Sequence, residues 1–196
     1  MVGIPVIDTR PVTVEEFYAF TDTRPDEEKW ELIEGEPVLN AAPSPMHQWI
    51  VRNVVLALGI RERELKAPWA VLPGLGIRVS DTDRPEPDIL VIPSDHRAID
   101  PRERDTSHVI VAFEVLSPST KGRDLRWKRT AYTSLPSLTH YVAIAQDAVE
   151  VVVFAREDDF AERRVRSFDD AIELRSLGIS LPVAEIYRDT GLVPVA

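Results

Sequence analysis

The sequence has no cysteine, few histidines and no long apolar run. Without cysteine, disulfide bonds and thiolate metal sites are excluded. The four histidines, His47, His96, His108 and His140, show no HxH or HExxH spacing, so a metal site must use oxygen ligands, which suits magnesium or manganese. No apolar run approaches the roughly 20 residues of a membrane span, and residues 1–11 lack a basic segment followed by an apolar one. We therefore expect a soluble cytoplasmic protein without membrane contacts.

The composition is that of a globular chain with an excess of acidic residues. It has 196 residues, 44% of them hydrophobic and 29% charged, which predicts one domain over residues 1–196. The formal net charge of −10 argues against a general nucleic-acid coat, because phosphate binding needs clustered Lys and Arg. Two basic groups, Lys121–Arg129 and the set Arg61, Arg63 and Lys66, are candidates for a local phosphate track. The alternative, given equal weight, is that surface acids neutralise them.

The order of apolar patterns predicts an α/β fold with a mixed β-sheet flanked by helices. Thr13 and Glu16 form a capping box that begins a short helix. Ser44 and Pro45 begin a longer helix that runs to about Leu65. The remaining expected elements are a hairpin over 30–39 around Gly35, strands over 69–72, 76–79, 88–92, 108–116, 139–145, 148–155 and 163–167, a polar loop over 94–107, a helix over 125–135 and a short helix or turn over 184–187.

The stretch from Ile110 to Thr120 begins as a buried strand, ends as the entry to a helix and carries one acid, Glu114. A charged side chain on a core strand is costly unless it is paired or bound to a metal. Asp88 begins another short apolar strand that runs to Ile92. We expect the two acids to lie side by side on neighbouring strands and to hold a divalent cation. Such an ion would lower the pKa of a bound water and neutralise a phosphate.

Each of these acids also has a structural interpretation. Asp88 follows a proline at the start of a strand, where aspartate is often a turn former. Glu114 lies between the apolar Phe113 and Val115, and its alternative is a structural ion pair with an arginine.

Three polar residues follow the central strand at a spacing of four, namely Asp124, Lys128 and Tyr132, and therefore share one face of a helix. In the functional interpretation this stripe lines a cleft. Lys128 would activate water or stabilise a developing negative charge, and Tyr132 would hold a phosphate or a water. In the alternative interpretation the stripe is solvated, with one Asp–Lys pair that contributes roughly 0.3 kcal/mol. The position of the stripe directly after the strand that carries Glu114 favours the functional interpretation.

Together these residues resemble the PD-(D/E)XK nuclease superfamily, in which a Pro-Asp pair precedes a glutamate at a strand end. A wider set of strings is similar to the Uma family of endonucleases within that superfamily. These strings are Trp30–Glu36, Pro43–Gln48, Pro87-Asp88, Glu114–Thr120, and Arg123-Asp124 with Lys128 and Tyr132. The resemblance runs from about Val12 to Tyr187. It implies a restriction endonuclease-like core and magnesium-dependent cleavage of phosphodiester bonds.

The resemblance also implies roles for individual residues. Asp88 and Glu114 match the metal ligands, and Val115 would offer its backbone carbonyl. Glu31, on the first hairpin, matches a family glutamate that contacts the metal through water; the alternative is an ordinary exposed strand residue. His47 lies in the first turn of the long helix, where free N–H groups favour an anion, and we expect it to be a cap partner rather than a ligand.

The lysine of the superfamily motif is missing, because the residue two positions after Glu114 is Leu116. Lys128 matches the family lysine that replaces it from the following helix, and a lysine side chain has the length for this role. Lys121, nearer in sequence but expected in the turn, is the alternative. Tyr132 completes the expected catalytic set.

The sequence therefore predicts a metal-dependent endonuclease that uses Mg²⁺ or Mn²⁺ and acts on nucleic acid, with DNA favoured over RNA. We also expect a homodimer, because twofold symmetry suits the cutting of two strands. Two alternatives stay open: a catalytically silent nuclease-fold binding module, and a metal-dependent hydrolase of a smaller phosphoester. The complete set of acids and lysine favours an enzyme, whereas the acidic balance favours a small or structured substrate over long duplex DNA.

Overall fold

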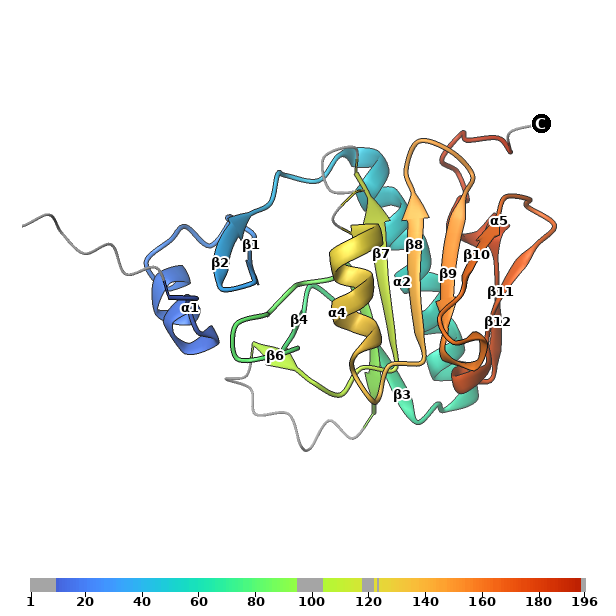
Figure 1. The fold of residues 1–196 in the computed structure, drawn as a ribbon. Helices are drawn as coiled ribbons and strands as arrows, with labels where there is room; N and C mark the ends of the chain where they lie inside the picture. The colour runs from blue at the N-terminus through green and yellow to red at the C-terminus, as the bar shows by residue number, and fades with distance from the viewer. Residues whose placement is uncertain (1–9, 95–103, 118–121, 123, 195–196) are drawn as a thin grey trace, which may run out of the picture.

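The computed structural model describes residues 10–94, 104–117, 122 and 124–194, and it is built around a six-stranded sheet (Figure 1). The strands lie in the order β10–β9–β8–β7–β5–β3. They are β3 (Trp69–Pro73), β5 (Ile89–Pro93), β7 (Val111–Leu116), β8 (His140–Ala145), β9 (Val151–Ala155) and β10 (Glu162–Val165). β7 and β8 are parallel and the other neighbours are antiparallel, which confirms the expected mixed sheet of an α/β fold.

The central strand β7 divides the core into two parts. Successive side chains of a strand point to opposite faces of the sheet. Accordingly Phe113 packs in an apolar cluster with the long helix, whereas Ala112 and Leu116 pack in a second cluster. All six residues of β7 are buried, which accounts for its nearly unbroken apolar sequence. Glu114 falls on the same face as Ala112 and Leu116.

One face of the sheet is covered by the long helix α2 (Pro45–Leu65), as Figure 1 shows. The helix begins as predicted, because Ser44 Oγ accepts the backbone N–H of His47 and Pro45 occupies the first turn. This arrangement brings the N-terminus of α2 to the end of the sheet where Glu114 lies, since Ser44 and Glu114 line the same cleft.

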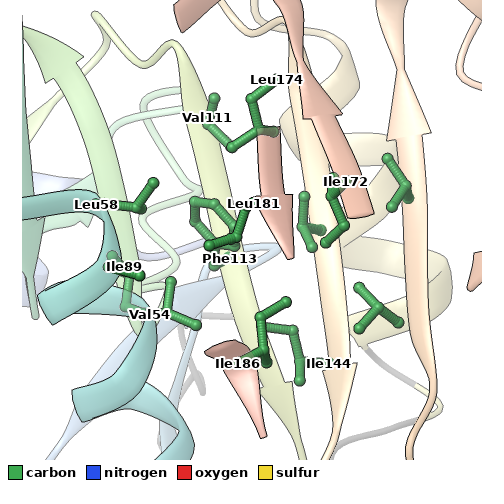
Figure 2. Close-up of a cluster of buried hydrophobic side chains, with 14 of the residues drawn as sticks. Val54, Leu58, Ile89, Val111, Phe113, Ile144, Ile172, Leu174, Leu181 and Ile186 are labelled. Atoms are coloured by element: carbon green, nitrogen blue, oxygen red, sulfur yellow. The ribbon is translucent and has the colours of Figure 1, made fainter. Parts of the chain in front are cut away.

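The same face is also covered by a C-terminal hairpin and a short helix, and the hairpin was not predicted from the sequence. The hairpin consists of β11 (Ala171–Leu174) and β12 (Ile179–Pro182), and α5 (Val183–Ile186) follows it. Figure 2 shows side chains of the helix, the sheet and the hairpin meeting in one cluster. The labelled members are Val54, Leu58, Ile89, Val111, Phe113, Ile144, Ile172, Leu174, Leu181 and Ile186. Complete burial of each such side chain contributes about 1.5–3 kcal/mol.

The opposite face is covered by the helix that follows β7. It includes one π-helical turn, η2 (Asp124–Lys128), and continues as α4 (Arg129–Thr133). The predicted helix over 125–135 is therefore present at the predicted position. It differs from the prediction because its turn Asp124–Lys128 is π-helical and its last helical residue is Thr133. Single π-helical turns inside helices are frequent at functional sites.

The N-terminal part of the described chain forms α1 (Val14–Thr21) and a hairpin of β1 (Trp30–Ile33) and β2 (Glu36–Leu39). The predicted capping box of α1 is present, with hydrogen bonds in both directions between Thr13 and Glu16. The hairpin turns at Gly35 as predicted, and its φ of +76° is a conformation that glycine adopts without strain.

Several shorter elements complete the fold. β4 (Gly76–Ile77) pairs in parallel with β6 (Asp105–Thr106), and η3 (Arg156–Asp158) and η4 (Arg175–Leu177) are single 3₁₀ turns. The expected strand over 76–79 is thus shortened, and most of the expected polar loop, residues 95–103, lies outside the described residues. Among the described residues, no helix has the length and apolar character to cross a membrane.

Gly35→Ala should destabilise the protein by more than the cost of placing an alanine at positive φ. A Cβ at this position would lie 2.3 Å from Pro11 Cβ, in addition to the strain at positive φ. Gly178→Ala is the matched control, because Gly178 has a similar φ of +68° but open space around it. We expect about 1–2 kcal/mol for the control and a larger loss for Gly35→Ala in urea denaturation. Equal losses would show that Pro11 moves away at no cost.

Candidate active site

Asp88 directly precedes β5, and Glu114 lies on the neighbouring strand β7, so the expected strand over 88–92 begins one residue later than predicted. In the antiparallel pair of β5 and β7, Ile89 lies opposite Phe113, so Asp88, one residue earlier, faces the position of Glu114. Asp88 Oδ2 accepts the backbone N–H of Val115 at 2.8 Å, which holds the two strand ends together. Both acids line a cleft of about 260 Å³. The expectation that the two acids share one site on adjacent strands agrees with this arrangement.

Lys128 reaches the same cleft from the π-helical turn. Its Nζ donates to Glu114 Oε1 at 2.7 Å and lies 2.7 Å from Glu31 Oε1 and 3.7 Å from Asp124 Oδ1. Its side chain is only 4% exposed. The alternative of a solvated polar stripe is therefore wrong, and the partner of Glu114 is a lysine rather than an arginine.

Glu31 is a buried member of this group and not an exposed strand residue. Its Oε1 accepts the backbone N–H of Glu86 at 2.7 Å, and its Oε2 accepts Asn40 Nδ2 at 2.9 Å. The hairpin is held in place because the backbones of Leu32 and Arg84 exchange hydrogen bonds at 2.8 and 3.1 Å. Glu31 thereby brings a second carboxylate to Lys128 from β1.

Tyr132 lies one helical turn after Lys128 and contacts the same oxygen of Glu114. Its hydroxyl donates to Glu114 Oε1 at 2.8 Å. Burial raises the pKa of Tyr132 well above its usual value, and the neighbouring Glu114 adds to the effect, so this hydroxyl keeps its proton. Tyr141 supports the helix from below by donating its hydroxyl to the carbonyl of Asp124 at 2.9 Å.

The contact between His47 and Asp88 was not predicted from the sequence. The backbone of His47 caps the helix as expected, but its Nε2 also lies 2.9 Å from Asp88 Oδ1. The available signal was the position of His47 three residues after the cap Ser44. The same cap hydroxyl donates to Gln146 Oε1 at 2.7 Å, which joins the end of β8 to the start of α2 across the cleft.

The electrostatics of the site are set by several acids around one ammonium group. Burial raises the pKa of Glu114 well above its usual value, because a carboxylate loses its hydration there. Lys128 opposes this shift, and the nearby Asp124, Asp88 and Glu31 reinforce it. Glu114 is therefore the member of the group that holds a proton most readily.

Glu31 behaves differently although it is equally close to Lys128. Burial alone would raise the pKa of Glu31, but Lys128 and the donors from Glu86 and Asn40 outweigh burial and lower it. Lys128 is likewise held in its charged form, because its acidic neighbours raise its pKa against the effect of burial. Lys128 therefore lies at equal distance from two acids, Glu31 with a lowered pKa and Glu114 with a raised pKa.

The donor set of the cleft consists of hard oxygen ligands, which suit a magnesium-type ion. Within the described part of the chain, no group of three or more His, Asp or Glu side chains is arranged to enclose a metal. Asp88 and Glu114 give two carboxylates, and Val115 lines the cleft beside them. Two carboxylates fit Mg²⁺, which usually keeps several waters and takes further oxygens from a phosphate substrate.

Two expectations about cations concern residues other than Lys128. Lys121 lies outside the described residues, so its rivalry with Lys128 stays a prediction. The basic group at residues 61–66 lies at the C-terminal end of α2, roughly 25 Å along the helix axis from His47. Arg61 there pairs with Glu185 at 2.9 Å. This second group is not part of the cleft.

Comparisons with known proteins agree with the fold. A crystal structure described as that of a "putative nuclease belonging to DUF820" from Anabaena variabilis matches with a TM-score of 0.72, covering 90% of this chain and 98% of that one at 17% identity. A protein of Synechocystis sp. strain PCC 6803, named "Uncharacterized protein slr1290", is 34% identical over 95 residues. That match covers 45% of this chain, and the chain spans about half the length of that relative.

The mixed sheet and its helices define a restriction endonuclease-like α/β protein. A family model, Uma2, described as "Putative restriction endonuclease", matches residues 14–184. The chain belongs to the Uma2 family. The resemblance inferred from the sequence is thereby confirmed at the level of family and fold.

Glu114→Gln should leave the metal-free protein as stable as the wild type or more stable at neutral pH. The unfolded chain loses the proton of Glu114 near its usual pKa of 4.5, whereas the folded protein keeps it to higher pH. Between these two pKa values the folded state binds more protons, so the free energy of unfolding falls as the pH rises. Glutamine cannot ionise and avoids this loss.

The measurement is the melting temperature of both proteins in a chelator between about pH 4 and about pH 8. The advantage of the variant should grow as the pH rises, and the exposed-site control Glu64→Gln should show no such trend. Strong destabilisation of Glu114→Gln at neutral pH would mean that Glu114 is ionised in the folded state and is a structural partner of Lys128.

Proposed function

We propose that the cleft hydrolyses phosphodiester bonds of nucleic acid with the help of a divalent cation, Mg²⁺ or Mn²⁺, and that DNA is the substrate. The observation that carries this proposal is the meeting of Asp88 and Glu114 on adjacent strand ends with the buried ammonium of Lys128 directed at Glu114. Membership of the Uma2 family supports the same reaction class.

Asp88, Glu114 and the backbone carbonyl of Val115 are the residues that would hold the ion. An ion bound there would supply a water of lowered pKa and would neutralise charge on the phosphate. Asp88 is oriented for this task on both sides, since Val115 N–H holds Oδ2 and His47 Nε2 contacts Oδ1. Tyr132 orients Glu114 by donating to Oε1.

Lys128 would stabilise negative charge that develops on the phosphate in the transition state. A fixed cation in a site that excludes water is effective because little reorganisation is needed when the charge appears. Glu31 holds the ammonium group in place from β1, and Asp124 approaches it from the preceding turn. Glu31 and Asp124 are thus positioning residues for Lys128.

A second candidate is a catalytically silent nuclease-fold module that binds nucleic acid. The observation that favours it is the short contact of Lys128 with both Glu31 and Glu114, at 2.7 Å each. An internal cation already compensates part of the acidic charge in this arrangement. The two candidates differ in whether the protein cleaves anything when a divalent ion is added.

Cleavage of labelled single-stranded DNA, duplex DNA and RNA should require Mg²⁺ or Mn²⁺ and should depend on Asp88 and Lys128. Asp88→Asn should lower both ion binding and cleavage, because a metal ligand loses its charge. Lys128→Met should lower the turnover number by roughly a hundredfold with ion affinity nearly unchanged, because the cation that stabilises transition-state charge is lost while Asp88 and Glu114 remain. Glu64→Gln and Lys66→Met change exposed charges away from the cleft and are the controls.

Melting curves of each variant separate loss of chemistry from loss of folding. Normal cleavage by folded Lys128→Met would show that Lys128 is not catalytic, and Lys121 would then be the candidate catalytic lysine. Absence of cleavage by the wild type on all three substrates with either ion would support the binding module instead.

Binding of Mn²⁺ should release protons and should become tighter as the pH rises. The raised pKa of Glu114 favours its protonated form in the metal-free site, and the carboxyl must lose its proton to become a ligand, so a higher pH lowers the cost of binding. Calorimetric titrations in two buffers of different ionisation enthalpy measure the number of protons released. Proton release that persists in Glu114→Gln would assign the proton to another group.

A further inference from the structure

A series of hollows leads from the candidate active site over β1 toward α1. The cleft and a neighbouring hollow of about 280 Å³ share Lys29 and Glu86 in their walls. That hollow and a third of about 370 Å³ share Trp30 and Arg104. In Figure 1, α1 and the β1–β2 hairpin lie together at one side of the molecule, where these walls are formed. The cleft therefore continues along the surface beyond its acidic end.

The walls of these hollows combine aromatic rings with cationic side chains. The guanidinium carbon of Arg24 lies 4.4 Å from the ring centroid of Phe20 and 5.9 Å from that of Trp30. The two rings meet edge to face at 4.9 Å. Lys29 stands between the cleft and the hollows with half of its side chain exposed. Two cations and a half-buried indole thus follow one another along the same path.

Four acids line the two hollows, Asp22, Asp26, Glu28 and Glu86, and three of them have partners among the described residues. Asp22 pairs with Arg104 at 2.6 Å, and Glu28 accepts the indole N–H of Trp30 at 2.7 Å. Glu86 accepts from Arg84 at 2.8 Å and lies 3.8 Å from Lys29. The ion pairs of Asp22 and Glu86 offset part of the acidic charge that would otherwise repel phosphates close to Arg24 and Lys29.

We propose that these hollows bind a single-stranded segment of nucleic acid next to the bond that is cleaved, with Arg24 and Lys29 contacting phosphates and Trp30 stacking against a base. Proteins bind single strands with a cationic groove and aromatic rings, and a base exposes its face for stacking only when it has left a duplex. The inference rests on the proposed function of the cleft, because it names the strand state of the same substrate.

Binding is measured without cleavage, by fluorescence anisotropy in a chelator, with labelled single-stranded DNA, single-stranded RNA of the same sequence and the DNA duplex. The double variant Arg24→Gln/Lys29→Gln should weaken single-strand binding by about tenfold. It should also make the slope of log affinity against log salt less negative by about 1.4, the value for two lost phosphate contacts. Comparison of the DNA and RNA arms distinguishes the two sources of a single strand.

The matched control is Arg63→Gln/Lys66→Gln, which removes the same charge from the far end of α2 and should leave the affinity within about twofold. Trp30→Leu keeps apolar bulk in the half-buried position but removes the stacking surface, and should weaken binding by about tenfold. Melting curves of both variants establish that they are folded.

Equal weakening by the two double variants would overturn the proposal, because it would show a general charge effect. Duplex binding as tight as single-strand binding, or unchanged binding by folded Trp30→Leu, would overturn it as well. The single-strand site and the proposed nuclease activity are contradicted by different results. If substitution of Arg24, Lys29 and Trp30 leaves cleavage unchanged, the single-strand site is wrong and the nuclease activity stands. If binding in a chelator depends on these residues but no cleavage occurs with added metal, the nuclease activity is wrong and the single-strand site stands.

Discussion

The buried ammonium of Lys128 is the interaction on which the site depends. It joins β1, β7 and the π-helical turn, because its three acidic neighbours come from these three elements. Removing a cation from water costs several kcal/mol, which only close and well-oriented acids recover. Glu31 and Glu114, each at 2.7 Å, meet that condition. The elements that carry them are thereby held in one arrangement, and the cleft is formed where they meet.

In the proposed mechanism, the position of Lys128 also accounts for an apolar residue, Leu116, at the usual position of the motif lysine. Leu116 packs in the apolar cluster with Tyr132 and Tyr141, and it is only 4% exposed. A lysine there would have to leave that cluster to reach the cleft. Lys128 instead approaches Glu114 from the covering helix, over the same face of the sheet. The positive charge thus reaches Glu114 from the helix and not from the strand β7.

Several acids surround the single ammonium of Lys128, and this excess of negative charge determines the pKa values of the site. Burial raises the pKa of Glu114, whereas Lys128 and additional donors keep the pKa of Glu31 low, so the pKa values of two glutamates at the same distance from Lys128 shift in opposite directions. Both contact the ammonium, and in the proposed mechanism Glu114 also holds the divalent ion. Asp88, oriented by Val115 N–H and by His47, stands beside the position of that ion. A divalent ion would complete the balance of charge.

The sequence by itself determined the features that depend on neighbours along the chain. These include the caps at Thr13 and Ser44, the turn at Gly35, the buried strand around Glu114 and the spacing of the polar residues after it, because capping and periodicity are local. Only the tertiary structure decided that Glu31 is buried, that His47 meets Asp88 across 41 positions and that the cleft continues to Trp30. It also supplied the C-terminal hairpin, whose strands are four residues each. Such contacts depend on the order and register of the strands, which local patterns do not encode.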